Sequence, residues 1–171
     1  LDTGIQILSK TNVLIAITLL LFVLVVGPTS YILNVLTTVV GDYLTQFVSL
    51  SLSTNPFEGY QWTKDWTLFY WAWWISWSPF VGLFVASISR GRTIREFVSG
   101  ALLVPTLLTF LWFAVFGATG LDLQLHQGVD LAAVAQSDVT LVLFEMFSYL
   151  PLGALLSLVA VALLSVFFVT S

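Results

Sequence analysis

The sequence predicts an all-α, polytopic membrane protein, and two observations support this fold class. Of its 171 residues, 58% are hydrophobic and only 8% are charged, with a mean hydropathy of +1.01. A soluble domain averages about 25% charged residues. Apolar runs also recur along the chain at lengths near the roughly 20 residues that a helix needs to cross a ~30 Å hydrocarbon core. The chain has no cysteine, which excludes disulfides and thiolate metal sites.

The first predicted span covers residues 13–33, which carry no charge. Gly27-Pro28 falls inside it, and because proline lacks a backbone donor we expect a bend there. Residues 36–52 alternate apolar and polar positions with helical spacing. We interpret them as an amphipathic helix at the membrane interface; the alternative is that they extend the first span as one long tilted helix.

Turn signals at Asn55-Pro56 and Glu58-Gly59 precede the second predicted span, residues 66–88, for which Asp65 is the expected N-cap. Thr93 and Glu96 have the spacing of a capping box and should begin the helix of the third span, residues 97–116. Pro105 is expected to kink this span.

Residues 117–137 are polar and acidic and are interpreted as a connection, with His126 a surface residue rather than a metal ligand. Residues 138–149 are apolar but too short to cross, which favours a re-entrant or interfacial helix. The fourth predicted span covers residues 152–171. The positive-inside rule places Lys10 and the Arg90–Arg95 loop in the cytoplasm, and the four spans then alternate without conflict.

Six of the seven tryptophans lie between Trp62 and Trp77. Those nearest the outer boundary fit an interfacial aromatic belt. Trp77 does not, because it lies 12 residues beyond Asp65, or about 18 Å along a helix, near mid-bilayer. Trp73 and Trp77 share a helical face with Phe80, and no charge occurs from residue 66 to 89.

Pro79 leaves the carbonyl of Ile75 without its helical donor, while Ser76 and Ser78 offer hydroxyls nearby. We therefore interpret residues 75–79 as a broken helix, of the kind that lines substrate cavities in transporters. Clustered π faces suit a quaternary ammonium, which has diffuse positive charge and no N–H to donate. The predicted site takes Trp73, Trp74, Trp77 and Ser76 as substrate-binding residues.

The run DWTLFYWAWWISWSPFVG followed by ISRGRTIREF resembles the signature region of the betaine/carnitine/choline transporter (BCCT) family. GIQILS, VVGPT and FFVTS match other family stretches in the same order. The resemblance implies a LeuT-type inverted-repeat carrier, of which this chain is an internal fragment. Residues 36–52 would be the periplasmic link between repeats. It also implies a multi-pass protein of the bacterial inner membrane, assembled as a homotrimer.

The resemblance assigns Trp73, Trp74 and Trp77 to the substrate path and aromatic box, and it implies a sodium site. The residues matched to sodium sites are Phe80, Phe167, Thr170 and Ser171. Carbonyl and hydroxyl oxygens are the ligands that a hard cation prefers, although ordinary packing between helices is the alternative for the last two. The version ISWSPFVG is more similar to the ion-coupled betaine or choline carriers than to the carnitine exchangers.

The sequence therefore predicts a secondary active transporter that takes up a quaternary-ammonium solute, with glycine betaine and sodium coupling favoured, for osmotic protection. A proton-coupled choline transporter and a carnitine/betaine exchanger remain alternatives, as does a membrane segment with only a structural role. The predicted spans lack the acids and bases of an enzyme site, and no basic cluster suits nucleic acid. No cofactor is expected beyond the coupling ion. The first residue is not Met and the last follows directly on an apolar run, from which we expect a piece of a larger protein.

Overall fold

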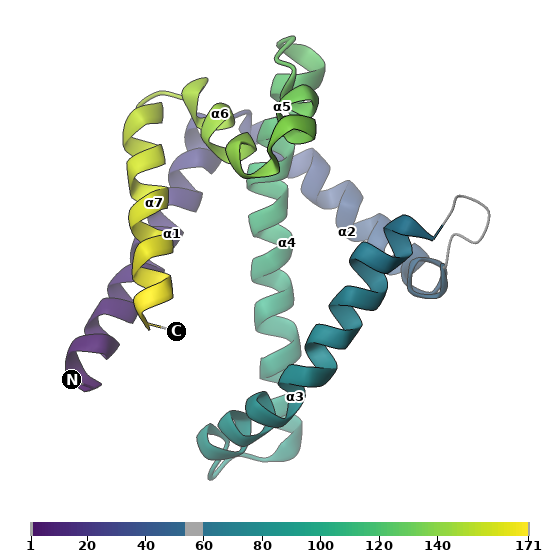
Figure 1. Cartoon of the computed structure of the whole chain (residues 1–171), viewed down its shortest axis with the longest axis vertical. Helices are drawn as coiled ribbons and strands as arrows, with labels where there is room; N and C mark the ends of the chain where they lie inside the picture. The colour runs from purple at the N-terminus through teal and green to yellow at the C-terminus, as the bar shows by residue number, and fades with distance from the viewer. Residues whose placement is uncertain (1, 54–59, 171) are drawn as a thin grey trace. The chain divides into compact units, whose positions relative to one another are not determined.

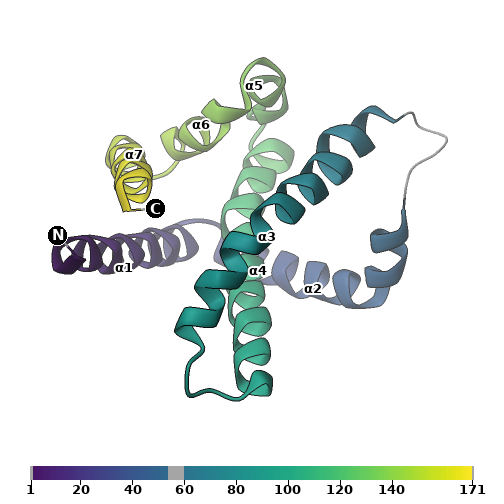
Figure 2. The same cartoon turned by 60° about the horizontal axis from the view of Figure 1, so that its bottom comes forward.

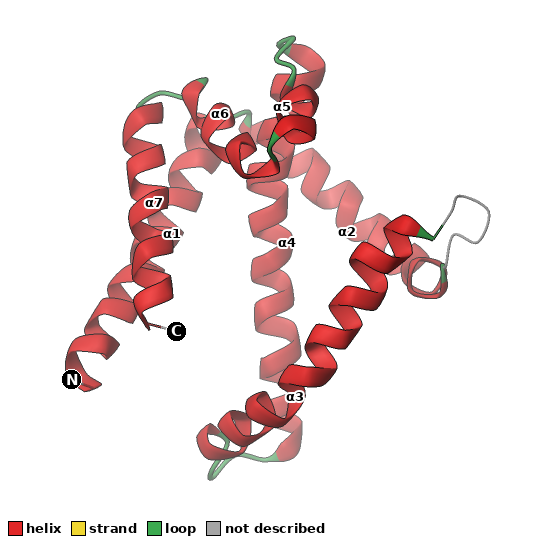
Figure 3. Ribbon diagram, viewed as in Figure 1, coloured by secondary structure: helices red, strands yellow, loops and turns green. Residues whose placement is uncertain are grey.

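The computed structural model describes residues 2–53 and 60–170, and every regular element in those ranges is a helix (Figure 3). Five helical segments are long and apolar enough to cross a membrane, one more than predicted. They are α1 (Asp2–Val26), α2 (Thr29–Leu52), α3 (Phe69–Ile88) with the π-helical turn η1 (Thr63–Leu68) before it, α4 (Ile94–His126) and α7 (Gly153–Thr170). The predicted all-α class is confirmed, whereas the turns predicted at residues 55–59 lie outside the described residues.

Three short helices connect α4 to α7 (Figure 2): α5 (Leu131–Ser137), the 3-10 turn η2 (Val139–Leu141) and α6 (Val142–Ser148). The chain divides into two compact units, which are described separately. Unit 1 comprises residues 1–40 and 108–171, and unit 2 comprises residues 41–107. The helices α2 and α4 each contribute residues to both units.

The expected bend at Gly27-Pro28 is a complete break between two helices. α1 ends at Val26, and the backbone N–H of Thr29 donates to the carbonyl of Gly27 at 2.8 Å to begin the next turn. The Thr29 hydroxyl donates to the carbonyl of Leu24 at 2.7 Å, which satisfies one of the acceptors that the end of α1 leaves without a helical partner. The amphipathic stretch 36–52 is thus not a separate helix, because α2 runs without interruption from Thr29.

Gly27 lies where this break packs against α4. A Cβ atom at this position would lie 2.7 Å from the carbonyl oxygen of Val23 and 3.3 Å from the Thr119 hydroxyl. We expect Gly27→Ala to destabilise the protein by about 1–3 kcal/mol, since crowding of this kind forces backbone shifts. Gly41→Ala is the matched control, because no atom lies within 4 Å of its added Cβ. Equal thermal unfolding temperatures for the two purified variants would contradict this description of the break.

The core of unit 1 forms where α1 and α7 lie side by side (Figure 1) and α4 and α6 pack against them. Phe147 of α6 and Val23 of α1 are fully buried there. Thr119 of α4 is the buried polar residue of this core, and its hydroxyl donates to the carbonyl of Val115 at 2.7 Å. This bond is the one expected of a buried polar group, whose desolvation is costly unless it is hydrogen-bonded.

The connection predicted for residues 117–137 is mostly helical, which corrects the sequence interpretation. α4 continues to His126, and α5 follows after a short turn. The buried positions Val115, Thr119 and Leu123 recur every four residues, so one face of α4 stays in the core although its other positions turn polar. Asp130 caps α5 by accepting from the N–H of Ala133 at 3.0 Å.

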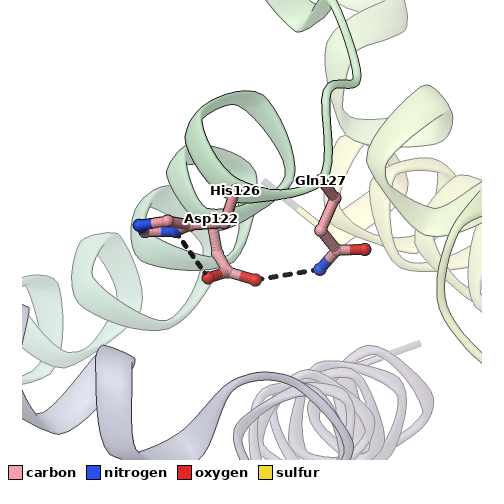
Figure 4. Close-up of polar contacts among 3 residues, drawn as sticks. All are labelled: Asp122, His126 and Gln127. Atoms are coloured by element: carbon pink, nitrogen blue, oxygen red, sulfur yellow. Dashed lines mark hydrogen bonds and ion pairs between the residues drawn. The ribbon is translucent and has the colours of Figure 1, made fainter.

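The end of α4 carries a small polar cluster, shown in Figure 4. The Asp122 carboxylate lies 3.0 Å from Nδ1 of His126 and accepts from the Gln127 amide at 2.9 Å. The His126 ring also meets the ring of Tyr31 edge-on, with centroids 5.3 Å apart. The side chain of His126 is 56% exposed, as expected for a surface residue, and among the described residues no three His, Cys, Asp or Glu side chains gather as metal ligands would.

Asp138 organises the turn between α5 and α6. Its carboxylate accepts from the N–H and the hydroxyl of Thr140 at 2.9 and 2.6 Å. These hydrogen bonds favour the ionised form and lower the pKa of Asp138. A lowered pKa stabilises the folded turn at neutral pH, and this contribution is lost as the pH falls through the pKa of the folded state.

Candidate functional site

The aromatic segment begins with a π-helical turn that the sequence did not suggest. Gln61 and Trp62 are already helical, and the π-helical turn η1 leads directly into α3. The expectation that Asp65 is the N-cap is therefore wrong. Its carboxylate instead accepts from the Gln61 side-chain amide at 3.0 and 2.9 Å. Asp65 thus stabilises the first turn as a residue within the helix, not as its cap.

The helix α3 is continuous through Pro79, which contradicts the predicted break at residues 75–79. The physical reason lies one residue earlier, where the Ser78 hydroxyl donates to the carbonyl of Ile75 at 2.8 Å. This is the carbonyl that loses its backbone donor to proline. A neighbouring serine can replace the missing bond in a membrane helix, and the helix then has no need to unwind.

This replacement can be tested with a double-mutant cycle at Ser78 and Pro79. Ser78→Ala should cost about 0.6–1.7 kcal/mol, the range of hydrogen bonds within membranes. In the Pro79→Ala background the cost should fall by more than half, because the substituted alanine again supplies a backbone N–H to the carbonyl of Ile75. Ser87→Ala is the control, since its hydroxyl bonds to Phe84 in a stretch without proline. Additive effects in thermal unfolding of the full-length protein would exclude this coupling.

The aromatic side chains of α3 form a chain of edge-on contacts. Trp73 and Trp77 have ring centroids 6.0 Å apart at 66°. Tyr70 contacts Trp73 at 6.2 Å and Trp74 at 6.1 Å. Tyr70 thus contacts both Trp73, on the face shared with Trp77, and Trp74, a role that sequence reasoning did not assign to it. Edge-on packing leaves ring faces open to a cation.

Two shallow grooves lie along this aromatic face. One has a volume of about 410 Å³ and is lined by Phe69, Ala72, Trp73 and Ser76. The other, about 490 Å³, is lined by Trp77, Phe80, Val81 and Phe84. The three tryptophans of the predicted site remain 49–55% exposed, so about half of the surface of each is not covered by the described residues.

The hydroxyl of Ser76 has a backbone partner, donating to the carbonyl of Ala72 at 2.8 Å. Its oxygen retains lone pairs that can accept a hydrogen bond. Within the first groove the side chain therefore offers an acceptor, not a donor. This suits a cation that carries N–H groups, while a trimethylammonium would interact with the ring faces alone.

The arginine-rich turn after α3 has the predicted local structure. Gly91 adopts φ +81°, a conformation that glycine accommodates without strain. The Glu96 carboxylate accepts from the Thr93 N–H at 3.1 Å, and the Glu96 N–H donates back to the Thr93 hydroxyl at 3.3 Å. This reciprocal pair is the predicted capping box at the start of α4.

The residues matched to sodium sites are divided between the two units. Phe80 belongs to α3 in unit 2 and is 73% exposed. Phe167 and Thr170 lie on the last turns of α7 in unit 1, and the Thr170 hydroxyl donates to the carbonyl of Val166 at 2.9 Å. Ser171 lies outside the described residues. The Thr170 oxygen can still accept or coordinate through its lone pairs, so its bond is compatible with a cation ligand.

Comparison with known proteins places these features in a family. A sequence model of the "BCCT, betaine/carnitine/choline family transporter" matches residues 1–171. The glycine betaine transporter OpuD of Bacillus subtilis is 48% identical over all of this chain, and glycine betaine transporter 1 of Vibrio parahaemolyticus is 43% identical over all of it. An ectoine/hydroxyectoine transporter of Virgibacillus pantothenticus is 41% identical, again over the whole chain.

The chain spans about a third of the length of these relatives, 33%, 32% and 34% respectively. The family comprises transporters, not enzymes. The match extends over every residue of the chain, including the aromatic segment and the capped arginine turn. This chain belongs to the betaine/carnitine/choline transporter family and is a multi-span part of a membrane protein.

Proposed function

We propose that the parent protein is a secondary active transporter that takes up a quaternary-ammonium solute, with glycine betaine its first substrate. The observation that supports this most is the row of tryptophans on α3, in a segment without charge from residue 66 to 89. Each desolvated ring face attracts a cation by about 2 kcal/mol. Two relatives that are named as glycine betaine transporters support the same proposal.

Coupling to sodium is part of the proposal. Residues 66–89, which carry the aromatic face, include no acid or histidine that could relay a proton. The oxygens of Phe167 and Thr170 at the end of α7, and the hydroxyl of Ser171 that follows in the sequence, are the kind that a hard cation takes. Sodium is then a co-substrate. The same proposal includes the bacterial inner membrane, a homotrimeric assembly and a role in osmotic protection.

Ectoine uptake is a second candidate function, favoured by the 41% identical ectoine/hydroxyectoine transporter and by the acceptor oxygen of Ser76 beside Trp73. A delocalised cation with N–H groups could donate to that oxygen while lying on the ring faces. The trimethylammonium group of glycine betaine, choline or carnitine has no N–H, by contrast, and would interact with the ring faces alone.

The test is uptake of radiolabelled glycine betaine by the full-length parent, in cells that lack their own osmolyte carriers, with and without external sodium. We expect uptake that requires sodium and that unlabelled glycine betaine inhibits more strongly than ectoine. Uptake unaffected by sodium would overturn the coupling. Absence of betaine uptake, with ectoine, choline or carnitine transported instead, would overturn the substrate.

A further inference from the structure

Tyr70 of α3 contacts two of the predicted substrate-binding residues, yet it lines neither groove of the aromatic face. Its ring centroid lies 6.2 Å from that of Trp73, with the ring planes at 87°. The centroid of Trp74 lies 6.1 Å away on the other side, with the planes at 61°. An effect of Tyr70 on a ligand in either groove would therefore pass through the tryptophans that it contacts.

Helical geometry explains why one ring meets both tryptophans. Trp73 and Trp74 are adjacent in the sequence, so their side chains leave the helix about 100° apart. Tyr70 precedes them by three and four residues, the two spacings at which side chains on one helix are neighbours. All three residues belong to α3. Their contacts lie within a single helix and do not depend on how α3 packs against other parts of the transporter.

The order of the two tryptophan rings matters for binding. A side chain that changes rotamer freely must be ordered when a ligand binds, and this ordering lowers the affinity. A neighbouring ring that already restricts the rotamer reduces that cost. Trp73 has such contacts from both Tyr70 and Trp77, whereas Trp74 has its contact from Tyr70. Edge-on packing restricts a ring while leaving faces open to a cation.

We infer that Tyr70 is a positioning residue of the candidate cation site, whose ring holds Trp73 and Trp74 in the orientation that meets a quaternary ammonium. The role belongs to the ring of Tyr70 and not to its hydroxyl. The two tryptophans are then ordered together through one side chain, although they lie on different sides of the helix. The effect on ligand affinity rests on the proposed function, whereas the order of the rings does not.

Fluorine NMR of the ligand-free, full-length protein tests the order of the rings. Tryptophan is replaced by 5-fluorotryptophan, and the two signals are assigned with Trp73→Phe and Trp74→Phe. In Tyr70→Leu we expect both signals to broaden or split, while in Tyr70→Phe they should stay as in the wild type. Trp112 gives the reference signal, since its ring contacts Phe116 of α4 at 4.7 Å. Unchanged signals in Tyr70→Leu, or an equal change at Trp112, would overturn the inference.

Ligand affinity tests the consequence for binding. We expect Tyr70→Leu to weaken glycine betaine binding by the purified full-length protein by roughly three- to tenfold, the range that the loss of an edge-on aromatic contact implies. Tyr70→Phe should retain the wild-type Kd. Tyr149→Leu is the matched control, because Tyr149 lies outside α3 and has nearly the same exposure, 51% against 52%. Equal losses in Tyr70→Phe and Tyr70→Leu would assign the effect to the hydroxyl and overturn the inference.

The two measurements separate this inference from the proposed function. Failure of the wild-type protein to bind glycine betaine would contradict the proposed substrate. The fluorine signals are recorded without ligand and would still decide whether Tyr70 orders Trp73 and Trp74. Conversely, wild-type affinity in Tyr70→Leu would overturn the positioning role and leave the proposed substrate intact.

Discussion

Trp77→Ala should weaken glycine betaine binding by the full-length transporter by roughly thirtyfold. This follows from the loss of one desolvated ring face, worth about 2 kcal/mol, at about 1.4 kcal/mol per tenfold change in Kd. Trp77 contacts Trp73 and lines the groove that continues to Phe80, so it links the two grooves of the aromatic face. The measurement is an equilibrium Kd for purified protein in lipid nanodiscs.

Two further variants make this result specific. Trp77→Phe retains a π face and should lose only a few-fold in affinity, because phenylalanine is a weaker cation–π partner than tryptophan. Trp66→Ala removes a tryptophan from the π-helical turn η1, which precedes α3, and should leave the Kd unchanged. Equal loss in Trp66→Ala and Trp77→Ala would mean that the aromatic row acts through membrane anchoring instead of substrate contact.

Phe147→Ala should be the most destabilising substitution, lowering the free energy of unfolding by about 3–5 kcal/mol. Phe147 is fully buried at the centre of unit 1, and its ring meets that of Phe116 at 6.3 Å. Truncation would open a cavity between α4, α6 and α7. Chemical or thermal unfolding of the purified full-length protein measures the loss. Phe168→Ala, at a ring that is 77% exposed in this chain, should cost much less; equal losses would contradict the assignment of the core.

The helices follow from runs of apolar residues, which is why the all-α class and the end of α3 near Ile88 could be predicted. The segments that connect the helices were predicted less accurately than the helices themselves. At Gly27-Pro28 the sequence indicates that the helix is interrupted, but not whether it bends or ends. The two outcomes differ in which donors pair with the backbone carbonyls that proline leaves without a helical partner. The Thr29 hydroxyl supplies one of those donors, and its partner is known only once the backbone is placed.

The extension of α4 to His126 shows a second limit of prediction from the sequence. Asp122 and the glycines at 117 and 120 resemble a polar loop by composition. In the structure they lie on a helix whose other face is buried at Thr119 and Leu123. Asp122 is satisfied within its own helix end by His126 and Gln127. Composition over a short window cannot distinguish a polar loop from the polar face of a half-buried helix.

For the candidate site, the sequence indicates which residues share a face of α3, since helical spacing alone determines this. It predicted unwinding at Pro79, which is wrong because Ser78 bonds to the freed carbonyl. The contact of Tyr70 with both Trp73 and Trp74 depends on side-chain rotamers and could not be derived from spacing.

The central claim is that the aromatic face of α3 recognises a cation that has no hydrogen-bond donor of its own. Its most direct test compares the binding of glycine betaine with that of 3,3-dimethylbutyrate, in which carbon replaces the quaternary nitrogen while shape and carboxylate are kept. Both Kd values are measured on the purified full-length transporter. If the face acts through cation–π attraction, the isostere should bind at least tenfold more weakly, corresponding to about 1.4 kcal/mol or more. Equal affinities would show that shape and apolar contact suffice, and would contradict the account.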